Sequence, residues 1–160
     1  MERANRILKN HTYCACLRQI DELEAERIFC GHDMTHFLDV ARLACLFNFE
    51  ENLKVEKERI YAAALLHDIG RHIQYREGIP HQKAGLPIAE EILKECGFDE
   101  AERADILEAI GRHRDVTVKD EPTLAGLIYR ADKASRACFG CRVEKECNWS
   151  DEKKNLYLEY

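Results

Sequence analysis

Residues 57–70, KERIYAAALLHDIG, decide the fold class. Their apolar side chains recur at spacings of three and four, which is the period of a helix with one buried face. Gly70 is a residue typical of a helix end, so the pattern predicts a helix over residues 57–69. The buried stripe of this helix consists of Ile60, Ala63, Ala64 and His67. A histidine, followed directly by Asp68, therefore completes a stripe that is otherwise apolar.

The helical period also dominates the N-terminal half of the chain. Residues 2–29 form an amphipathic pattern that we expect to break near Cys14 or Asp21. Asp33 is a typical N-cap for the helix that follows. Both segments therefore predict helices that bury one face.

Further helices are expected in the C-terminal half. Pro87 suits the first turn of a helix that ends at Gly97, and a second helix is predicted over residues 99–112. A third is introduced by Glu121 and Pro122 and runs to about Cys138. The one β-leaning piece lies between them and has no partner strand. We therefore expect an all-α, compact helical bundle.

The composition is that of one globular domain. Hydrophobic residues make up 46% and charged residues 34% of the 160 residues. With 24 basic and 30 acidic residues the formal charge is -6, so specific nucleic-acid binding is not indicated. The N-terminus lacks the apolar core of a signal peptide, and no apolar run approaches the roughly 20 residues that span a bilayer. We expect a cytoplasmic protein without membrane association.

Ligand-type side chains share the apolar faces of four predicted helices. Burying one such group without a partner costs several kcal/mol, and a carboxylate costs more unless it is paired or bound to a metal. A shared cation would satisfy all of them, and imidazole with carboxylate suits zinc, iron, manganese and similar divalent ions. Any one alone is more often a hydrogen-bonded core residue, so the interpretation depends on their coincidence. The residues are His36, His67, Asp68, His113 and Asp132.

The adjacent pair His67 and Asp68 restricts the geometry of such a site. Neighbouring side chains point about 100° apart on a helix, so both can serve one site only at the helix end or if the carboxylate bridges two ions. The bridging role is favoured for Asp68. Two bridged metals about 3.5–4 Å apart can activate a shared water and clamp a phosphoryl group.

The ordered set of motifs resembles the HD superfamily, in which a first His, a His-Asp pair and a later Asp bind metal. The motifs are THFLDVARLA (35–44), ALLHDIGRH (64–72) and LIYRADKAS (127–135). The resemblance implies that His36, His67, Asp68 and Asp132 hold a first metal. It also implies that His81, in PHQKAGLPIAEEIL, and His113, in AIGRHR, hold a second metal that Asp68 bridges to the first.

The same resemblance implies a domain plan. The chain is expected to be a single HD domain over residues 1–160 with its core at about 32–136. N-terminal helices over residues 1–31 precede this core. A tail that contains cysteines follows it at 137–160.

The resemblance implies a phosphohydrolase that acts on a nucleotide or another small phosphate ester through a metal-activated water. One or two divalent ions are implied, without distinction among Fe, Mn, Zn, Ni, Co and Mg. Arg71 stands where related motifs often have lysine, and it is expected to bind phosphate or to form a surface salt bridge. His72 is a candidate proton donor or a support for the ligands. The catalytic candidates are therefore Asp68, Arg71 and His72.

Two other roles are kept open at this point. The six-ligand order also suits an HD-type mixed-valent di-iron oxygenase, and a catalytically silent module that binds its ligand with a metal would keep the same residues. For His32, a pocket or helix-start role is favoured over that of a further ligand. Lys133 and Arg136 flank Asp132 and face either substrate or solvent, of which solvent is favoured. No residue pattern specifies the oligomeric state.

Cys138, Cys141 and Cys147 form a separate pattern, CFGCRVEKEC, directly after the last predicted helix. Three thiolates could bind a metal ion or cluster if a fourth ligand comes from Cys14, Cys16 or Cys30. Reduced packing thiols or an oxidation-linked disulfide are the alternatives. Trp149 and the final NLYLEY are expected to pack this tail on the bundle.

Overall fold

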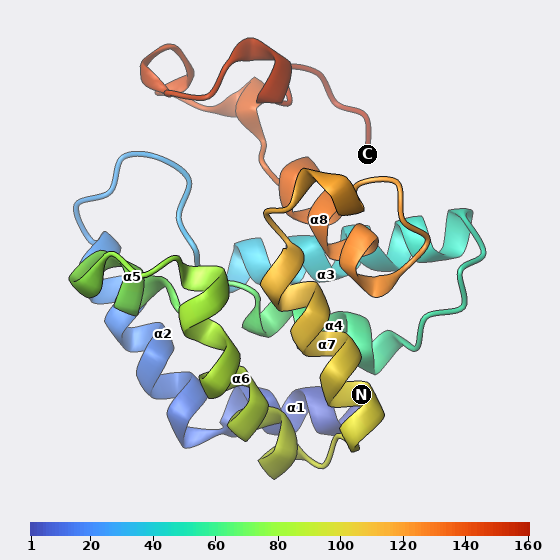
Figure 1. Ribbon diagram of the computed structural model, residues 1–160. Helices are drawn as coiled ribbons and strands as arrows, with labels where there is room; N and C mark the ends of the chain where they lie inside the picture. The colour runs from blue at the N-terminus through green and yellow to red at the C-terminus, as the bar shows by residue number, and fades with distance from the viewer.

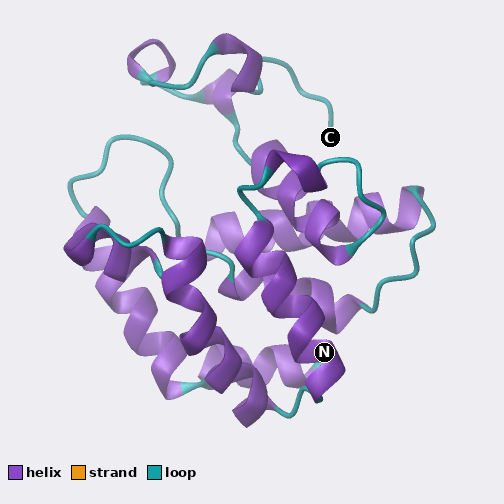
Figure 2. Ribbon diagram, in the orientation of Figure 1, coloured by secondary structure: helices purple, strands orange, loops and turns teal.

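The computed structural model describes residues 1–160 and contains helices and loops without a strand (Figures 1 and 2). This confirms the expected all-α class. Short 3-10 turns lie at Val116–Val118, Cys138–Gly140, Glu144–Glu146 and Asp151–Lys153. None of the helices combines the length and the apolar composition that a membrane-spanning segment requires. The helices are α1 (Glu2–Lys9), α2 (His11–Glu24), α3 (Met34–Glu50), α4 (Lys57–Leu66), α5 (Arg71–Glu77), α6 (His81–Cys96), α7 (Glu100–Arg112) and α8 (Leu124–Ala134).

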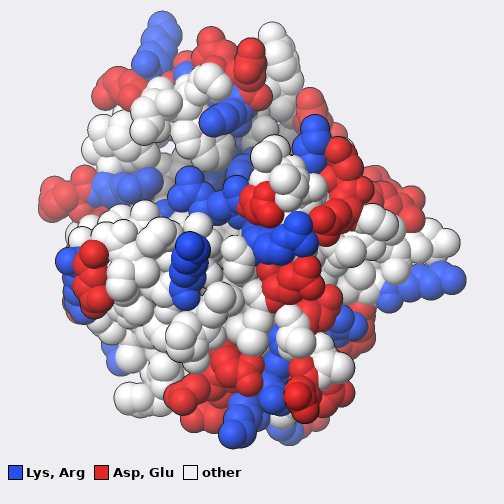
Figure 3. All heavy atoms as spheres, viewed as in Figure 1, with Lys and Arg blue, Asp and Glu red and all other residues white.

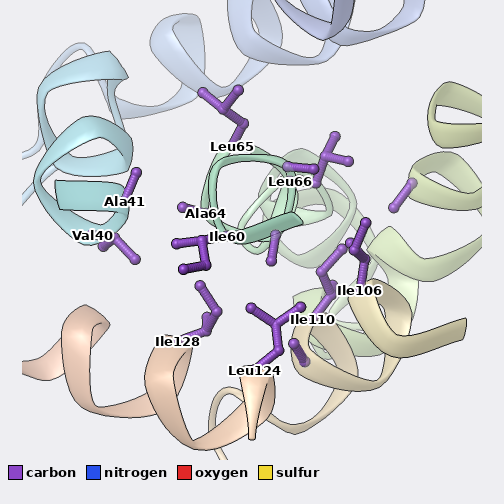
Figure 4. Packing of buried hydrophobic residues seen from close by; sticks show 14 of the residues in the cluster. Val40, Ala41, Ile60, Ala64, Leu65, Leu66, Ile106, Ile110, Leu124 and Ile128 are labelled. Atoms are coloured by element: carbon purple, nitrogen blue, oxygen red, sulfur yellow. The ribbon is translucent and has the colours of Figure 1, made fainter. Parts of the chain in front are cut away.

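Helix α4 occupies the centre of the core, and α3, α7 and α8 surround it (Figure 4). Ile60 of α4 is fully buried against side chains such as Val40 of α3 and Ile128 of α8. Burial of one such branched side chain contributes about 1.5–3 kcal/mol. The alanines of α4 are also fully buried, and their small size lets the neighbouring helices approach closely. The central helix is therefore the one that ends in the His-Asp pair.

Ion pairs attach the N-terminal helix α1 to this core. Arg3 Nε lies 2.9 Å from Glu58 Oε2, and Arg3 Nη1 lies 2.5 Å from Glu102 Oε2. Ile7 is fully buried beside them. The expected break near Cys14 or Asp21 is wrong, because the chain turns at Asn10. The Asn10 side chain accepts a hydrogen bond from the Tyr13 amide and so caps α2.

Helix α2 ends at Glu24, so the expectation of a helical pattern to residue 29 is wrong at its end. Residues 27–33 form a loop in which Ile28 is 61% exposed. The apolar residues of this loop continue the helical pattern in the sequence, but they are not buried in the structure. The loop leads to α3, whose N-cap Asp33 was predicted correctly and accepts a hydrogen bond from the His36 amide.

Helix α6 begins at His81, which corrects the expected start at Pro87. Pro87 lies inside the helix, in its second turn, where the missing amide removes one hydrogen bond without ending the helix. The helix ends as predicted at Gly97, which adopts a left-handed conformation with φ of 88°.

The helix predicted over residues 57–69, α4, ends earlier, at Leu66, so it is not ended by Gly70. Gly70 precedes α5, a helix that the sequence pattern did not predict, and its φ is -82°. A Cβ at this position would lie 2.4 Å from the His81 carbonyl oxygen and 2.5 Å from the Gly85 amide nitrogen. Close backbone approach between α5 and α6 therefore explains the glycine.

The chain after α8 contains only short 3-10 turns and few buried side chains. Helix α8 ends at Ala134, before the predicted end at Cys138. No residue after Cys138 is buried. The C-terminal Tyr160 ring does contact Phe47 of α3, with ring centroids 4.8 Å apart, and Asn155 Nδ2 donates to the Lys133 carbonyl at 2.7 Å. The tail is thus placed against α3 and α8 by a few contacts, and Trp149 is half-buried.

Candidate metal centre

The six predicted ligands come together in the interior, from α3, the turn after α4, α6, the end of α7, and α8. All are buried, with whole-residue exposure from 0% to 8%. They form two groups, and within each group the ligand atoms lie within 4.8 Å of one another. The first group is His36, His67 and Asp132, and the second is Asp68, His81 and His113.

Asp68 lies between the two groups and directs one oxygen toward each. Its Oδ2 is 3.1 Å from His67 Nε2 and 3.7 Å from His36 Nε2. Its Oδ1 is 3.0 Å from His81 Nε2 and 3.8 Å from His113 Nε2. One carboxylate thus serves both groups, which is the geometry of a bridging ligand.

Hydrogen bonds on the outer nitrogens fix the tautomers of the histidines. His67 Nδ1 donates to the Ala64 carbonyl at 2.7 Å, and His113 Nδ1 donates to the Ile110 carbonyl at 2.7 Å. His81 Nδ1 is 2.5 Å from Gln74 Oε1, again an acceptor. In a neutral imidazole this leaves a lone pair on Nε2, directed into the site. These are the partners that orient metal-binding histidines.

His36 follows the same pattern through a hydroxyl. Ser135 Oγ donates to the Asp132 carbonyl at 2.8 Å and can therefore accept from His36 Nδ1, which lies 3.2 Å away. Arg136 Nη2 is 3.0 Å from His36 Nε2 and so donates to its lone pair. Arg136 thus faces the site and not the solvent, and it also lies 3.7 Å from Asp132 Oδ1.

The charges of the site favour cation binding. Burial tends to raise the pKa of Asp68, but His67 and Arg71 outweigh it and hold the pKa well below its usual range. Asp132 is likewise held low, chiefly by His36 and Lys133 against the effect of burial. Burial and the neighbouring His67 lower the pKa of His113 to about 3. At neutral pH the carboxylates are therefore ionised and His113 is neutral, as metal ligands must be.

Two observations test whether these residues fit a metal. Asp68 Oδ2 is buried without a hydrogen-bond partner, an arrangement that costs free energy unless a cation satisfies it. His81 Nε2 and His113 Nε2 lie 3.0 Å apart although both outer nitrogens already donate elsewhere. Two facing lone pairs repel each other unless a positive ion lies beside them. The residues present therefore fit divalent metal ions.

Arg71 and His72 are placed differently relative to this site. Arg71 Nε donates to Asp68 Oδ1 at 2.9 Å, and its side chain is 17% exposed, so it stands at the edge of the ligands. His72 is buried, but its Nδ1 donates to the Ile69 carbonyl at 3.0 Å and it makes no hydrogen bond to the six ligands. Burial also lowers the pKa of His72, which disfavours the protonated form. The catalytic roles of both residues stay predictions.

Beside His32 the structure places Glu24 and Tyr75, which the sequence motifs did not show. His32 is 3% exposed, its Nδ1 lies 2.5 Å from Glu24 Oε1, and its Nε2 lies 3.8 Å from Asp68 Oδ2. Tyr75 donates to the same Glu24 oxygen. Burial tends to raise the pKa of Glu24, but the His32 and Tyr75 hydrogen bonds lower it to about 2. Glu24 therefore holds His32 toward the site from the end of α2, as the favoured pocket role required.

The comparison with known families agrees with this geometry. Residues 33–137 match the HD domain family. The chain belongs to the HD superfamily. The matched residues include all six ligands, and they exclude His32, Glu24 and all but the first residue of the cysteine-containing tail. The resemblance seen in the sequence motifs is thereby confirmed.

Relatives of this HD protein cover it to different extents. A protein of Clostridium beijerinckii is 46% identical over 160 residues, the full length of both chains. Ribonuclease Y of Oleidesulfovibrio alaskensis is 30% identical over 128 residues, 80% of this chain but 22% of the ribonuclease. The crystal structure of a predicted HD superfamily hydrolase from an uncultured Thermotogales bacterium has a TM-score of 0.62 and 26% identity, and the match covers 89% of this chain and 81% of that one.

Proposed function

We propose that this HD protein hydrolyses a small phosphate ester, such as a nucleotide, with two divalent metal ions held by the six ligands. The observation that carries the proposal is the position of Asp68, whose two oxygens face separate histidine groups at 3.0 and 3.1 Å. Bound divalent ions would lower the pKa of a water molecule and neutralise phosphate oxygens. The likeness to a predicted HD superfamily hydrolase supports the reaction class.

Protein cations at the edge of the site support an anionic substrate. Arg71 uses Nε on Asp68, which leaves the Nη groups of its planar guanidinium as donors for phosphate oxygens. Arg136 and Lys133 flank Asp132, at 3.7 Å and 2.5 Å from its two oxygens. Figure 3 shows Lys and Arg side chains gathered between the C-terminal tail and the helices below it. This local charge is opposite in sign to the net charge of -6.

An opening next to His36 supports a small substrate. A hollow of about 230 Å³ is lined by Cys30, Gly31, Asp33, Thr35, His36, Asp39, Ser135, Arg136 and Ala137. It combines the outer edge of the ligand set with one guanidinium group. A compact phosphate ester suits this space better than the face of a large macromolecule.

The hydrogen bonds of His32 define the role that we propose for it, which is to orient the attacking water. Because Nδ1 donates to Glu24, Nε2 presents a lone pair beside Asp68. It can accept a hydrogen bond from the attacking water and so fix the direction of attack. Glu24 and Tyr75 act as positioning residues for His32.

Hydrolysis by metal-loaded protein is the direct test. Protein of measured metal content should be incubated with Mn, Fe, Co, Ni or Zn and a panel of phosphomonoesters, nucleotides and phosphodiesters, with short RNA included because of the likeness to Ribonuclease Y. We expect release of phosphate or nucleotide that depends on the metal. Iron-dependent oxygen consumption with an organic substrate and no phosphate release would assign the site to oxygenase chemistry. Tight phosphate binding without turnover would assign it to a silent binding module.

A further inference from the structure

Four cysteines lie in the C-terminal tail and in the loop between α2 and α3, two segments that contact each other. Cys30 belongs to that loop, and Cys138, Cys141 and Cys147 belong to the tail. All four are free thiols. None of them belongs to the six ligands of the metal centre, although Cys30 also lines the hollow next to His36.

A hydrogen bond holds the loop and the tail together. Arg136 Nη1 donates to the Gly31 carbonyl at 3.0 Å. Gly31 directly follows Cys30, and Arg136 lies two positions before Cys138. Cys30, Gly31, Arg136 and Ala137 also line the same hollow. In Figure 1 the loop and the tail face each other at the same end of the molecule. Cys30 is therefore the distant cysteine that the fold brings to the tail.

Two of the tail's cysteines follow short turns of the backbone. The Cys141 amide donates to the Cys138 carbonyl at 3.1 Å, and the Cys147 amide donates to the Glu144 carbonyl at 3.2 Å. Both cysteines thus end a 3-10 turn. Burial raises the pKa of the Cys138 thiol, and the nearby Cys30, Cys147 and Cys141 raise it further. This electrostatic influence agrees with the contact that Arg136 makes between the loop and the tail.

The tail has no apolar core that could hold this arrangement. No residue after Cys138 is buried, and the regular structure there consists of short 3-10 turns. Short segments without a core are commonly ordered by a metal or a disulfide. Four free thiols in two neighbouring segments are suitable ligands for a metal ion or a cluster.

We propose that Cys30, Cys138, Cys141 and Cys147 bind an iron–sulfur cluster through four thiolates. A single zinc ion with bonds of about 2.3 Å would draw its four sulfurs to within about 4 Å. The groups of ligand atoms that lie within 4.8 Å of one another contain no cysteine, so these sulfurs are spread more widely. Structural zinc sites also commonly use two Cys-x2–4-Cys pairs, whereas this chain supplies one such pair and two separate cysteines.

The cluster would connect the tail to the metal centre. Cys30 is two residues before His32, whose Nε2 lies 3.8 Å from Asp68 Oδ2. A thiolate ligand at Cys30 therefore fixes the loop that brings His32 into the pocket. The assignment of the four-cysteine site does not rest on the proposed hydrolysis, because none of its ligands belongs to the six-residue set.

The test is the chemical content of the full-length protein, purified without oxygen from cells supplied with iron. We expect acid-labile sulfide together with iron, and a visible charge-transfer absorption that dithionite bleaches. Sulfide distinguishes this centre from any iron at the six-ligand site, which needs none. Cys30→Ser and, separately, Cys147→Ser should reduce sulfide to background. Cys14→Ser is the matched control, since Cys14 lies near the start of α2, at the opposite end of the molecule (Figure 1), and should retain it.

Circular dichroism shows whether each variant keeps its helices, and either folded variant suffices for the test. Limited proteolysis provides a second readout, with faster cleavage within residues 139–160 expected when the cluster is lost. Sulfide at background in the wild-type protein, with no metal bound to the cysteines, would overturn the site. A wild-type protein that contains stoichiometric zinc and no sulfide, with the zinc lost in Cys30→Ser, would overturn the assignment of the site as an iron–sulfur cluster.

Discussion

Gly70 and His81 approach each other so closely that a Cβ on Gly70 would lie 2.4 Å from the His81 carbonyl oxygen. This contact sets the position of α6 against the turn that carries His67 and Asp68. The two histidine groups of the metal centre therefore depend on a glycine that coordinates nothing.

Gly70→Ala should lower the free energy of unfolding by about 3 kcal/mol, because the new methyl group meets backbone atoms that cannot move aside cheaply. Thermal unfolding measures the change. Gly111→Ala is the control, since its Cβ would lie 3.7 Å from Leu86 Cδ1 inside α7, and alanine there should stabilise the helix by up to about 1 kcal/mol. Equal stability of Gly70→Ala and wild type would contradict the close approach.

Asp68→Asn should abolish hydrolysis and reduce bound metal at both groups. The amide keeps the size of the side chain but removes the charge that both groups share, and its nitrogen cannot ligate. Metal analysis after dialysis and the phosphate-release assay check this. Asp120→Asn, at a side chain 85% exposed, should leave both measurements unchanged. Full activity in Asp68→Asn would eliminate the proposed site.

His32→Asn tests the residue that Glu24 holds toward Asp68. Asparagine has an amide near the position of Nδ1 that can still contact Glu24, but no atom at the position of Nε2. We expect kcat to fall about 10- to 100-fold, with metal content and unfolding temperature close to those of wild type. His11→Asn, at an exposed histidine of α2, should have no effect on kcat. An unchanged kcat in His32→Asn would remove His32 from the reaction.

Glu24→Gln should reproduce part of this effect, because a neutral amide holds the imidazole less firmly than a carboxylate does. The expected kcat lies between those of wild type and His32→Asn. The double variant should be no slower than His32→Asn alone, since Glu24 acts through His32. Additive losses in the double variant would show that Glu24 acts by another route.

Glu58 makes stability depend on pH through the contacts of α1. Burial tends to raise its pKa, but hydrogen bonds from Arg3 and the N-terminus lower it from 4.5 to about 2. Between these values the folded protein binds fewer protons than the unfolded chain. The stabilisation is therefore complete above pH 4.5 and is lost as the pH falls to about 2.

Glu58→Gln should thus reduce the free energy of unfolding at pH 7 by about 1–2 kcal/mol and flatten its acid dependence. Urea unfolding at several pH values measures both effects. Glu2→Gln, at a side chain 80% exposed, should keep the wild-type slope. A Glu58→Gln curve parallel to that of wild type would contradict the ion-pair account.

Periodicity predicted the class of the fold and most of its helices, because buried faces leave a clear pattern in α3, α4 and α7. It failed where local chemistry or close contact decides the structure. Asn10 breaks the first segment through its side-chain cap, and Pro87 is tolerated inside α6. The reason for Gly70 lies in a tertiary contact that no local pattern contains.

The six ligands were identified in the sequence because each continues an apolar stripe or belongs to a motif. Glu24 and Tyr75 carry no such signal, since both are common surface residue types and meet only after α2 and α5 pack together. Cys30 was one of three candidates for the fourth thiolate, and spacing alone did not distinguish among them. Only the fold places Cys30 beside the tail.

The helical hydrogen bonding of α4 stops at Leu66, and the next bonds join residues three apart, with Ile69 donating to Leu66 at 3.1 Å and Arg71 to Asp68 at 3.0 Å. This tighter turn lets the neighbouring side chains of His67 and Asp68 reach one metal centre. A continuous α-helix would point them about 100° apart. A redesign that joined α4 and α5 into one continuous helix would raise the helix content. It would also turn the His67 and Asp68 side chains away from their common metal centre. Engineering for thermal robustness in this protein should therefore leave that irregular turn untouched.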